Sequence, residues 1–105
     1  MASCKIYLDK SKLSPDSTPS FLADLLNRAL DVEEDTAVVI IPATLAVPAG
    51  CYIEILCKKQ PNRTHQVLQN LAIQIDESAR RMFQIEEPIR VRIVMLEEDF
   101  IFGVN

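Results

Sequence analysis

The pattern of apolar residues occurs twice along the chain, and this repeat restricts the possible folds more than any other feature. Each copy reads as a strand, an amphipathic helix and a second strand. Because a helix of this length can return the chain to a parallel neighbouring strand, we expect an α+β fold of order βαββαβ, a two-layer sandwich with both helices on one face of a four-stranded sheet. The copies cover about residues 4–42 and 51–96, with strands predicted at 5–10, 36–41, 51–57 and 89–96 and helices at 19–32 and 64–84.

The predicted helices show apolar residues three and four positions apart, from Phe21 to Leu30 and from Val67 to Phe83. Thr18 and Thr64 precede the two helices and are suitable N-caps, and Pro19 suits a first helical position. Segment 36–41 is apolar on both faces, as in an interior strand, and Pro42 is expected to end it.

Length and composition restrict the class of protein. A chain of 105 residues, 49% of them hydrophobic, supports one core and hence a single domain over residues 1–105, since about two-thirds of its surface can be buried. The net charge of −4, without a basic cluster, argues against nucleic-acid binding. The longest apolar stretch, 37–48, is interrupted by prolines and is shorter than the roughly 20 residues of a membrane-spanning helix.

The three cysteines and the single histidine indicate neither a metal site nor a disulfide. Cys4, Cys51, Cys57 and His65 do not follow the spacing of zinc ligands. Cys51 and Cys57 lie on one face of a predicted strand, roughly 20 Å apart at about 3.3 Å per residue, which is beyond the reach of a disulfide. We expect reduced thiols, no metal and no cofactor. Because no apolar leader segment follows Met1, we also expect a cytoplasmic location.

Two helices on one face leave the other face of the sheet uncovered. We expect this open face to hold Val38, Ile40, Ile53 and Ile55, or the residues that alternate with them. Monomeric proteins rarely expose contiguous apolar patches larger than a few hundred Å². The uncovered face therefore predicts self-association.

Short motifs in a fixed order span nearly the whole chain. They are Ser14-Pro15-Asp16 before Phe21-Leu22, the segment 39–45 followed by Ala49-Gly50, Asn62-Arg63-Thr64 before the second helix, Arg90-Val91-Arg92-Ile93 in the last strand, and Phe102-Gly103-Val104-Asn105. In order and spacing they resemble the family of macrophage migration inhibitory factor and D-dopachrome tautomerase. The resemblance implies a trimer whose three sheets close into a central barrel wrapped by six helices, with a short strand around residues 101–102 joining a neighbouring subunit. Such a barrel would cover the open sheet face.

The resemblance also identifies what the family's chemistry requires. Its tautomerases use an N-terminal proline as general base, and counting back without gaps from the first helix places Cys4 there. An internal cysteine has no free amine, whereas Ala2, if exposed by processing, would offer an ordinary α-amino group. The family's pocket tyrosine and asparagine correspond to Arg92 and Val94, and its glycine-containing loop is shortened to a turn with Lys59. The resemblance therefore implies a degenerate site, with Cys4, Lys59, Arg92 and Val94 lining a relic pocket.

Two functional hypotheses follow from these residues. In the first, the protein is a trimeric pseudoenzyme that binds proteins, as a cytokine-like ligand of a receptor or as a modulator of a family paralogue. In the second, it is a keto–enol tautomerase in which Arg92 holds an anionic keto acid and Cys4 or the Ala2 amine acts as base or nucleophile. Simpler roles compete: Cys4 as a small core residue, and Arg92 in an intersubunit ion pair with a carboxylate such as Glu54, Glu97 or Glu98. Members of the family are cytosolic and can be exported without a signal peptide, so the resemblance allows both locations.

Overall fold

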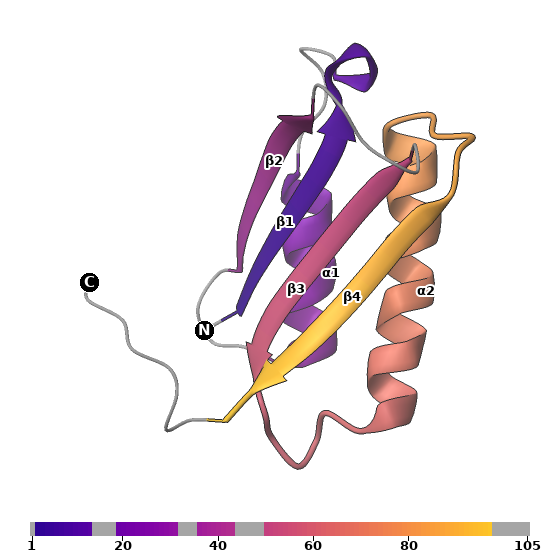
Figure 1. Cartoon of the computed structure of the whole chain (residues 1–105). Helices are drawn as coiled ribbons and strands as arrows, with labels where there is room; N and C mark the ends of the chain where they lie inside the picture. Colours follow the sequence, from indigo (N-terminus) through magenta and orange to yellow (C-terminus); the bar gives the residue numbers. More distant parts are fainter. Residues whose placement is uncertain (1, 14–18, 32–35, 44–49, 98–105) are drawn as a thin grey trace.

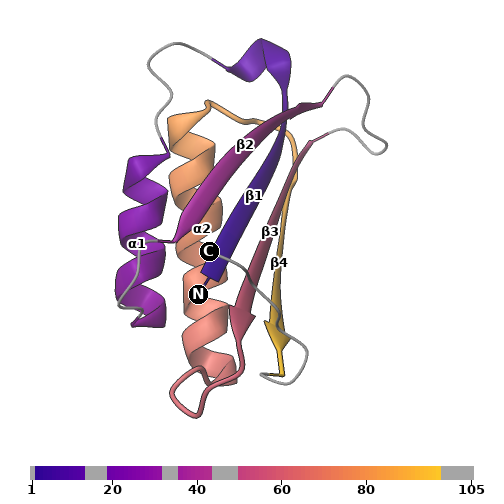
Figure 2. The ribbon, with the colours of Figure 1, turned by 90° about the vertical axis from the view of Figure 1, so that its left-hand side faces the viewer.

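The four strands form one sheet in the order β2-β1-β3-β4, and both helices pack against the same face of it (Figures 1 and 2). The computed structural model describes residues 2–13, 19–31, 36–43 and 50–97. This arrangement confirms the predicted α+β fold of order βαββαβ. The elements are β1 (Ala2–Asp9), the short 3-10 helix η1 (Lys10–Lys12), α1 (Ser20–Leu30), β2 (Ala37–Ala43), β3 (Cys51–Lys58), α2 (His65–Met82) and β4 (Ile89–Leu96).

The directions of the strands follow from the two crossovers. β1 and β2 are parallel, β3 and β4 are parallel, and the two pairs meet antiparallel at β1 and β3. Each helix connects the two strands of its own parallel pair, as a strand–helix–strand repeat requires (Figure 2). The central strands β1 and β3 are therefore paired on both sides, whereas β2 and β4 form the edges of the sheet.

Two strand boundaries differ from the prediction by more than one residue. β1 begins at Ala2 rather than at residue 5, because its first residues pair with the end of β3, where Ala2 lies opposite Cys57. β2 continues through Pro42 to Ala43 instead of ending before the proline. Among the described strands β2 pairs only with β1 and is therefore at an edge, and an edge tolerates a residue that cannot donate to the hydrogen-bond ladder.

Helix α1 is also shorter than predicted. The helix begins at Ser20, after Pro19, which contributes no side-chain cap. It ends at Leu30, because Asp31 adopts a left-handed conformation with φ of 51° and donates its N–H to the Asn27 carbonyl. Thr18, the predicted cap, lies outside the described residues.

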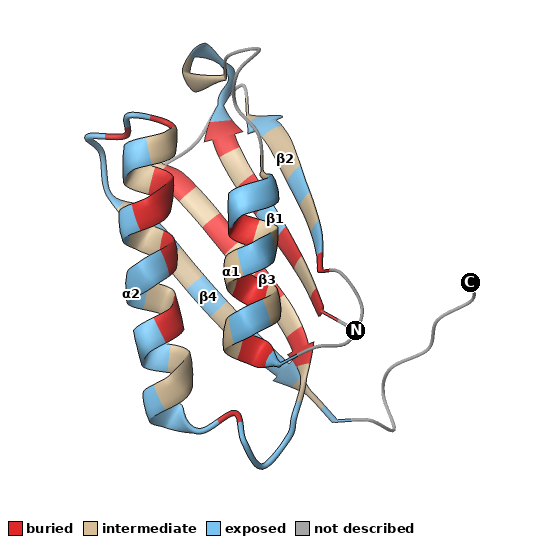
Figure 3. Ribbon diagram, turned by 180° about the vertical axis from the view of Figure 1, so that it is seen from behind, coloured by how far each residue is buried: buried red, intermediate tan, exposed pale blue. Residues whose placement is uncertain are grey.

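The core lies between the sheet and the helices. Alternate residues of β1 and β3 point toward the helices and are buried. Helix residues three and four positions apart cover them, and Figure 3 shows this buried side of each helix turned toward the sheet. The most deeply buried side chains are Ile6, Leu8, Leu22, Leu26, Leu30, Ile53, Ile55, Leu71, Ile75, Cys4, Cys51 and Cys57.

Of the two sets of residues that the sequence left open for the uncovered face, the structure places there the residues that alternate with the four named ones. Ile53 and Ile55 are fully buried beneath the helices, and Val38 and Ile40 are partly buried against the same core. The alternating residues, such as Val39, lie on the open face instead. A strand that is apolar on both faces does not reveal its orientation in the sequence, because a shift of one residue exchanges the two faces.

Arg63 is a charged residue inside the structure, only 5% exposed, in the turn between β3 and α2. Its Nη1 donates to the Lys58 carbonyl at the end of β3, and its Nη2 donates to the Leu30 carbonyl at the end of α1, at 3.0 Å. A cation complements the partial negative charge of a helix C-terminus. The guanidinium thus ties together β3, α1 and the segment that leads into α2.

Thr64 caps α2, as the sequence predicted, since its hydroxyl oxygen accepts a hydrogen bond from the Val67 N–H at 3.3 Å. Replacing Thr64 with alanine is expected to lower the free energy of unfolding by about 1 kcal/mol, because this N–H loses its acceptor. Urea denaturation of both proteins measures the difference. Thr64→Ser keeps the hydroxyl and is the matched control; a loss as large in the serine variant would contradict the capping role.

Candidate functional site

Three charged side chains form a row across the open face of the sheet. The strand register places Lys5 of β1 beside Glu54 of β3, and Glu54 beside Arg92 of β4. Opposite charges on neighbouring strands stabilise a sheet, so Glu54 balances the two cations that flank it. On the other side of Lys5, Val39 of β2 continues the row and is 50% exposed.

A pair of tyrosines forms the next row of the open face. The ring centroids of Tyr7 and Tyr52 are 5.8 Å apart and the ring planes are inclined by 43°, a favourable arrangement for aromatic side chains. The Tyr52 hydroxyl donates a hydrogen bond to Glu54 Oε2 at 3.3 Å. Desolvation, followed by the charge of Glu54, raises the pKa of Tyr52, so the hydroxyl remains protonated and the row presents a neutral donor.

The open face carries more positive than negative charge, although the whole chain has a net charge of −4. Among the described residues of the four strands, four cations and two anions share this face. Acidic side chains on a partner surface would therefore favour its packing against this face. The cations are Lys5, Lys58, Arg90 and Arg92, and the anions are Asp9 and Glu54.

Cys4 lies on the opposite face from Arg92. It alternates with Lys5 along β1, points toward the helices and is 1% exposed. Burial, and secondarily the charge of Cys51, raises the pKa of the Cys4 thiol to about 12. The thiol is therefore protonated at neutral pH, whereas the thiolate is the reactive form. Within one chain, the structure does not bring together the two residues on which the second hypothesis depends.

The remaining predicted site residues lie at two places. Arg92 and Val94 are exposed on the open face, two residues apart along β4. Lys59 follows β3, and its exposed side chain forms an ion pair with Glu97 at 3.3 Å. Ala2 begins β1, and its side chain is buried beneath the helices. Of the predicted residues, only Arg92 and Val94 are thus placed side by side on one surface.

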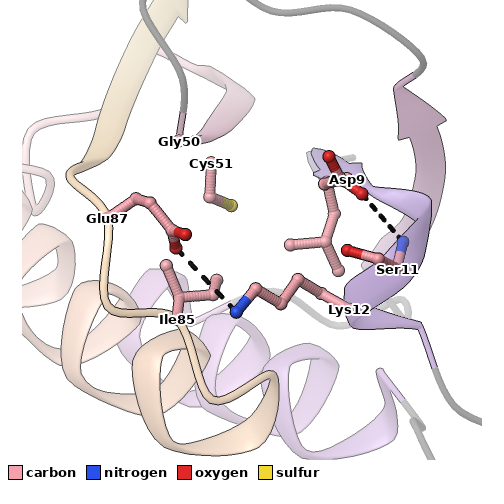
Figure 4. A pocket seen from close by; sticks show the side chains of 8 residues that line it. Asp9, Ser11, Lys12, Gly50, Cys51, Ile85 and Glu87 are labelled. Carbon is pink, nitrogen blue, oxygen red and sulfur yellow. Dashed lines mark hydrogen bonds and ion pairs between the residues drawn. The ribbon is translucent and has the colours of Figure 1, made fainter.

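A cavity that the sequence did not predict lies at the end of β1 remote from Ala2 (Figure 4). Its lining comes from the end of β1, η1, the start of β3 and the connection between α2 and β4. It includes Cys51, whose thiol has its pKa raised to about 11, mainly by desolvation. The lining segments are far apart in the sequence and share no motif, so no local pattern could have indicated this cavity.

The thiols and acidic residues give no sign of a metal centre. All three cysteines are free and buried, and the described residues hold no group of three or more His, Cys, Asp and Glu that could bind a metal ion. Neither of the two described α-helices is both long enough and apolar enough to cross a membrane.

No protein-family model matches the sequence, and no curated protein is significantly similar to it. Solved structures do match the fold. Macrophage migration inhibitory factor from Trichinella spiralis superposes with a TM-score of 0.73 at 12% identity, covering 97% of this chain and 94% of that chain. The F6 fused 4-OT wild-type asymmetric trimer gives 0.73 at 15% identity, with 97% and 91% covered. N1, a member of the cis-3-chloroacrylic acid dehalogenase family, gives 0.72 at 13%, with 96% and 79% covered.

The chain therefore has the same fold as these solved structures. It matches migration inhibitory factor over nearly the full length of both chains. The resemblance indicated by the sequence is thus confirmed at the level of the fold. Fold alone does not determine function, so the activity has to be argued from the residues present.

Proposed function

We propose that this protein is a homotrimer with a degenerate tautomerase site and that it acts by binding other proteins. The position of Cys4, which stands in the place of the family's catalytic base, carries the proposal. It is buried on the helix side of the sheet, and its thiol has a pKa of about 12. General acid–base catalysis needs a group within reach of the substrate and with a pKa near the working pH. Cys4 meets neither condition.

The open face supports the trimeric part of the proposal. Val39 and Val94 are 50% and 41% exposed on it, and covering apolar area contributes about 25 cal/mol per Å². Glu54 and Arg92 on the same face can form ion pairs between subunits. A similar structure, the fused 4-OT protein, is itself described as a trimer.

The proposed partners are a protein receptor or a catalytic paralogue of the same fold. A paralogue would enter a mixed trimer through the open face, whereas a receptor would contact the outer surface of the homotrimer. A cytoplasmic protein that can also be exported without a signal peptide would meet either one. Co-purification from the source organism distinguishes the two partners.

Purified protein is expected to sediment as a trimer and to leave hydroxyphenylpyruvate unconverted beyond the buffer rate. Val39→Glu is expected to shift sedimentation toward the monomer, because it places a charge on the apolar part of the interface. Phe21→Glu, on the exposed side of α1, is the matched control and should remain trimeric. A stable wild-type monomer would contradict the assembly, and turnover abolished by one pocket substitution would contradict the loss of catalysis.

A tautomerase with altered chemistry is the alternative, and the exposed guanidinium of Arg92 favours it. Arg92 lies on the open face beside Val94, and a guanidinium can bind the carboxylate of an anionic keto acid through two hydrogen bonds. The base would be the Ala2 amine or Cys4. Arg92→Ala and Cys4→Ser should then each lower turnover, and unchanged turnover in both would exclude this function.

A further inference from the structure

The cavity at the end of β1 is enclosed by an apolar floor and a charged rim (Figure 4). Leu8, Cys51 and Ile85 contribute to its floor and are each at most 4% exposed. The cavity measures about 100 Å³, and one water needs only about 10–15 Å³ of such space. There is therefore room for several water-sized groups, as in a small organic molecule.

The rim combines one cation and two carboxylates. Lys12 Nζ lies 4.0 Å from Glu87 Oε2 and donates a hydrogen bond to the Gln84 carbonyl at 3.3 Å. Across the cavity, Asp9 Oδ1 accepts a hydrogen bond from the Ser11 N–H at 2.8 Å, which lowers the pKa of Asp9 and keeps it ionised. Figure 4 shows the Asp9, Lys12 and Glu87 side chains arranged around the central space.

The wall of the cavity is held by backbone contacts. The Cys51 N–H donates to the Pro88 carbonyl at 3.1 Å, which joins the start of β3 to the segment before β4. Gly50 has a φ of 140°, and a Cβ there would collide with the same carbonyl oxygen. A residue with a side chain would therefore disturb this wall, whereas glycine allows the close approach.

The Cys51 thiol points into the cavity (Figure 4). The residue is 1% exposed, and its thiol is not part of a disulfide. An aliphatic ligand group would pack against this sulfur and the neighbouring apolar side chains without leaving a polar group unpaired.

We propose that this cavity binds a small zwitterion with a short aliphatic body, such as a free apolar α-amino acid. The ligand carboxylate would pair with the Lys12 ammonium, and its ammonium with the Asp9 and Glu87 carboxylates. The aliphatic body would cover the floor formed by Leu8, Cys51 and Ile85. The charges of the rim favour a zwitterion over other ligands. An amine without a carboxylate would bring a second cation beside Lys12, and a carboxylate without an amine would face two anions. The floor of the cavity lies on the helix side of the sheet, whereas Asp9 at its rim also borders the open face that the proposed trimer covers.

Titration of the ¹⁵N-labelled protein with L-valine, followed by NMR, tests this proposal. Saturable shifts are expected for the amides of Cys51 and Ile85. Isobutylamine and isovalerate carry the same aliphatic group with only one of the two charges. Each is expected to bind about fivefold more weakly or worse, since a partly exposed ion pair contributes up to about 1 kcal/mol. No saturable shift with valine, or equal affinity for either analogue, would overturn the proposal.

Variants of the rim separate this site from general effects of charge. Lys12→Met and Glu87→Gln are each expected to weaken valine binding several-fold, and both residues are exposed enough for the fold to tolerate them. The exposed Lys59–Glu97 ion pair supplies the matched controls, Lys59→Met and Glu97→Gln, which should leave the affinity unchanged. Unchanged affinity in both rim variants would also overturn the proposal.

Discussion

Replacing Arg63 with methionine is expected to lower the free energy of unfolding by about 2–5 kcal/mol. Methionine keeps the aliphatic stem but removes both donors, so the Lys58 and Leu30 carbonyls lose their hydrogen bonds. The Leu30 carbonyl is among the last of α1, which have no partner within the helix. Removing a buried charge relieves some desolvation cost, but leaving the buried Leu30 carbonyl and the partly buried Lys58 carbonyl unpaired costs more.

Two further variants distinguish this role from a general effect of charge. Arg63→Lys retains the charge but cannot reach both carbonyls as a fork does, so an intermediate loss is expected. Arg81→Met, on the exposed side of α2, removes an arginine without a buried partner and should change the stability by less than about 0.5 kcal/mol. Urea denaturation measures all three. Equal stability of the Arg63→Met and Arg81→Met variants would contradict the proposed tie between β3 and α1.

Raising the pH above the ordinary thiol pKa is expected to destabilise the protein steeply. Burial raises the pKa of Cys4 from 9.0 to about 12 and that of Cys51 to about 11. Above pH 9.0 the thiols ionise in the unfolded chain while they stay protonated in the folded one, so each additional pH step favours unfolding. Each thiol then costs about 1.4 kcal/mol per pH unit until the pH reaches its folded pKa. Below pH 9.0 this contribution is constant.

The Cys4→Ala variant separates the contribution of this thiol to the pH dependence of stability from that of the lysines and tyrosines, which titrate in the same pH range. The variant has a smaller side chain in the core and is less stable at neutral pH, but it lacks one buried ionisable group. The stabilities of the wild type and the variant should therefore converge as the pH rises from 9.0, by about 1.4 kcal/mol per unit. If the free energies of unfolding of the two proteins instead changed in parallel with pH, Cys4 would have the same pKa in the folded and unfolded states. That result would contradict the prediction.

The same burial links stability to the proposed function. Cys4 contributes to the core only as a neutral thiol, and a neutral thiol cannot act as a base at neutral pH. Proton transfer at Cys4 would need the thiol to leave the helix side of the sheet, because Arg92 and the open face lie on the other side. This incompatibility supports the proposed loss of catalysis at Cys4.

The sequence predicted the elements better than the faces of the sheet. The range of β4 and the Thr64 cap agree with the structure, because apolar spacing and capping are local properties. The predictions were incomplete or wrong where the local sequence pattern carries no information about tertiary packing. The sequence left open whether Ile53 and Ile55 or the residues that alternate with them lie on the open face, and β3 buries both isoleucines beneath the helices. Pro42 was expected to end β2, although its edge position accommodates it.

The candidate site was likewise predictable where neighbouring residues of one strand are concerned, and unpredictable where distant segments meet. Arg92 and Val94 were predicted to share a face, because residues two apart in a strand do so. The sequence of β1 does not show whether Cys4 lies on the same face as Arg92 and Val94. That depends on how β1 pairs with β3 and on which face the helices cover. The partners of Arg63 and the cavity around Cys51 involve segments distant in sequence, and no motif connects them.

By itself, the sequence determined the order of strands and helices, the apolar side of each helix and the presence of an uncovered sheet face. These features depend on spacing along the chain, where each residue acts on near neighbours. Only the tertiary structure decided which side of each strand faces the helices, and hence that Cys4 is enclosed while Arg92 is exposed. That decision is set by pairing between distant strands, because a shift of one residue exchanges every inward side chain for an outward one.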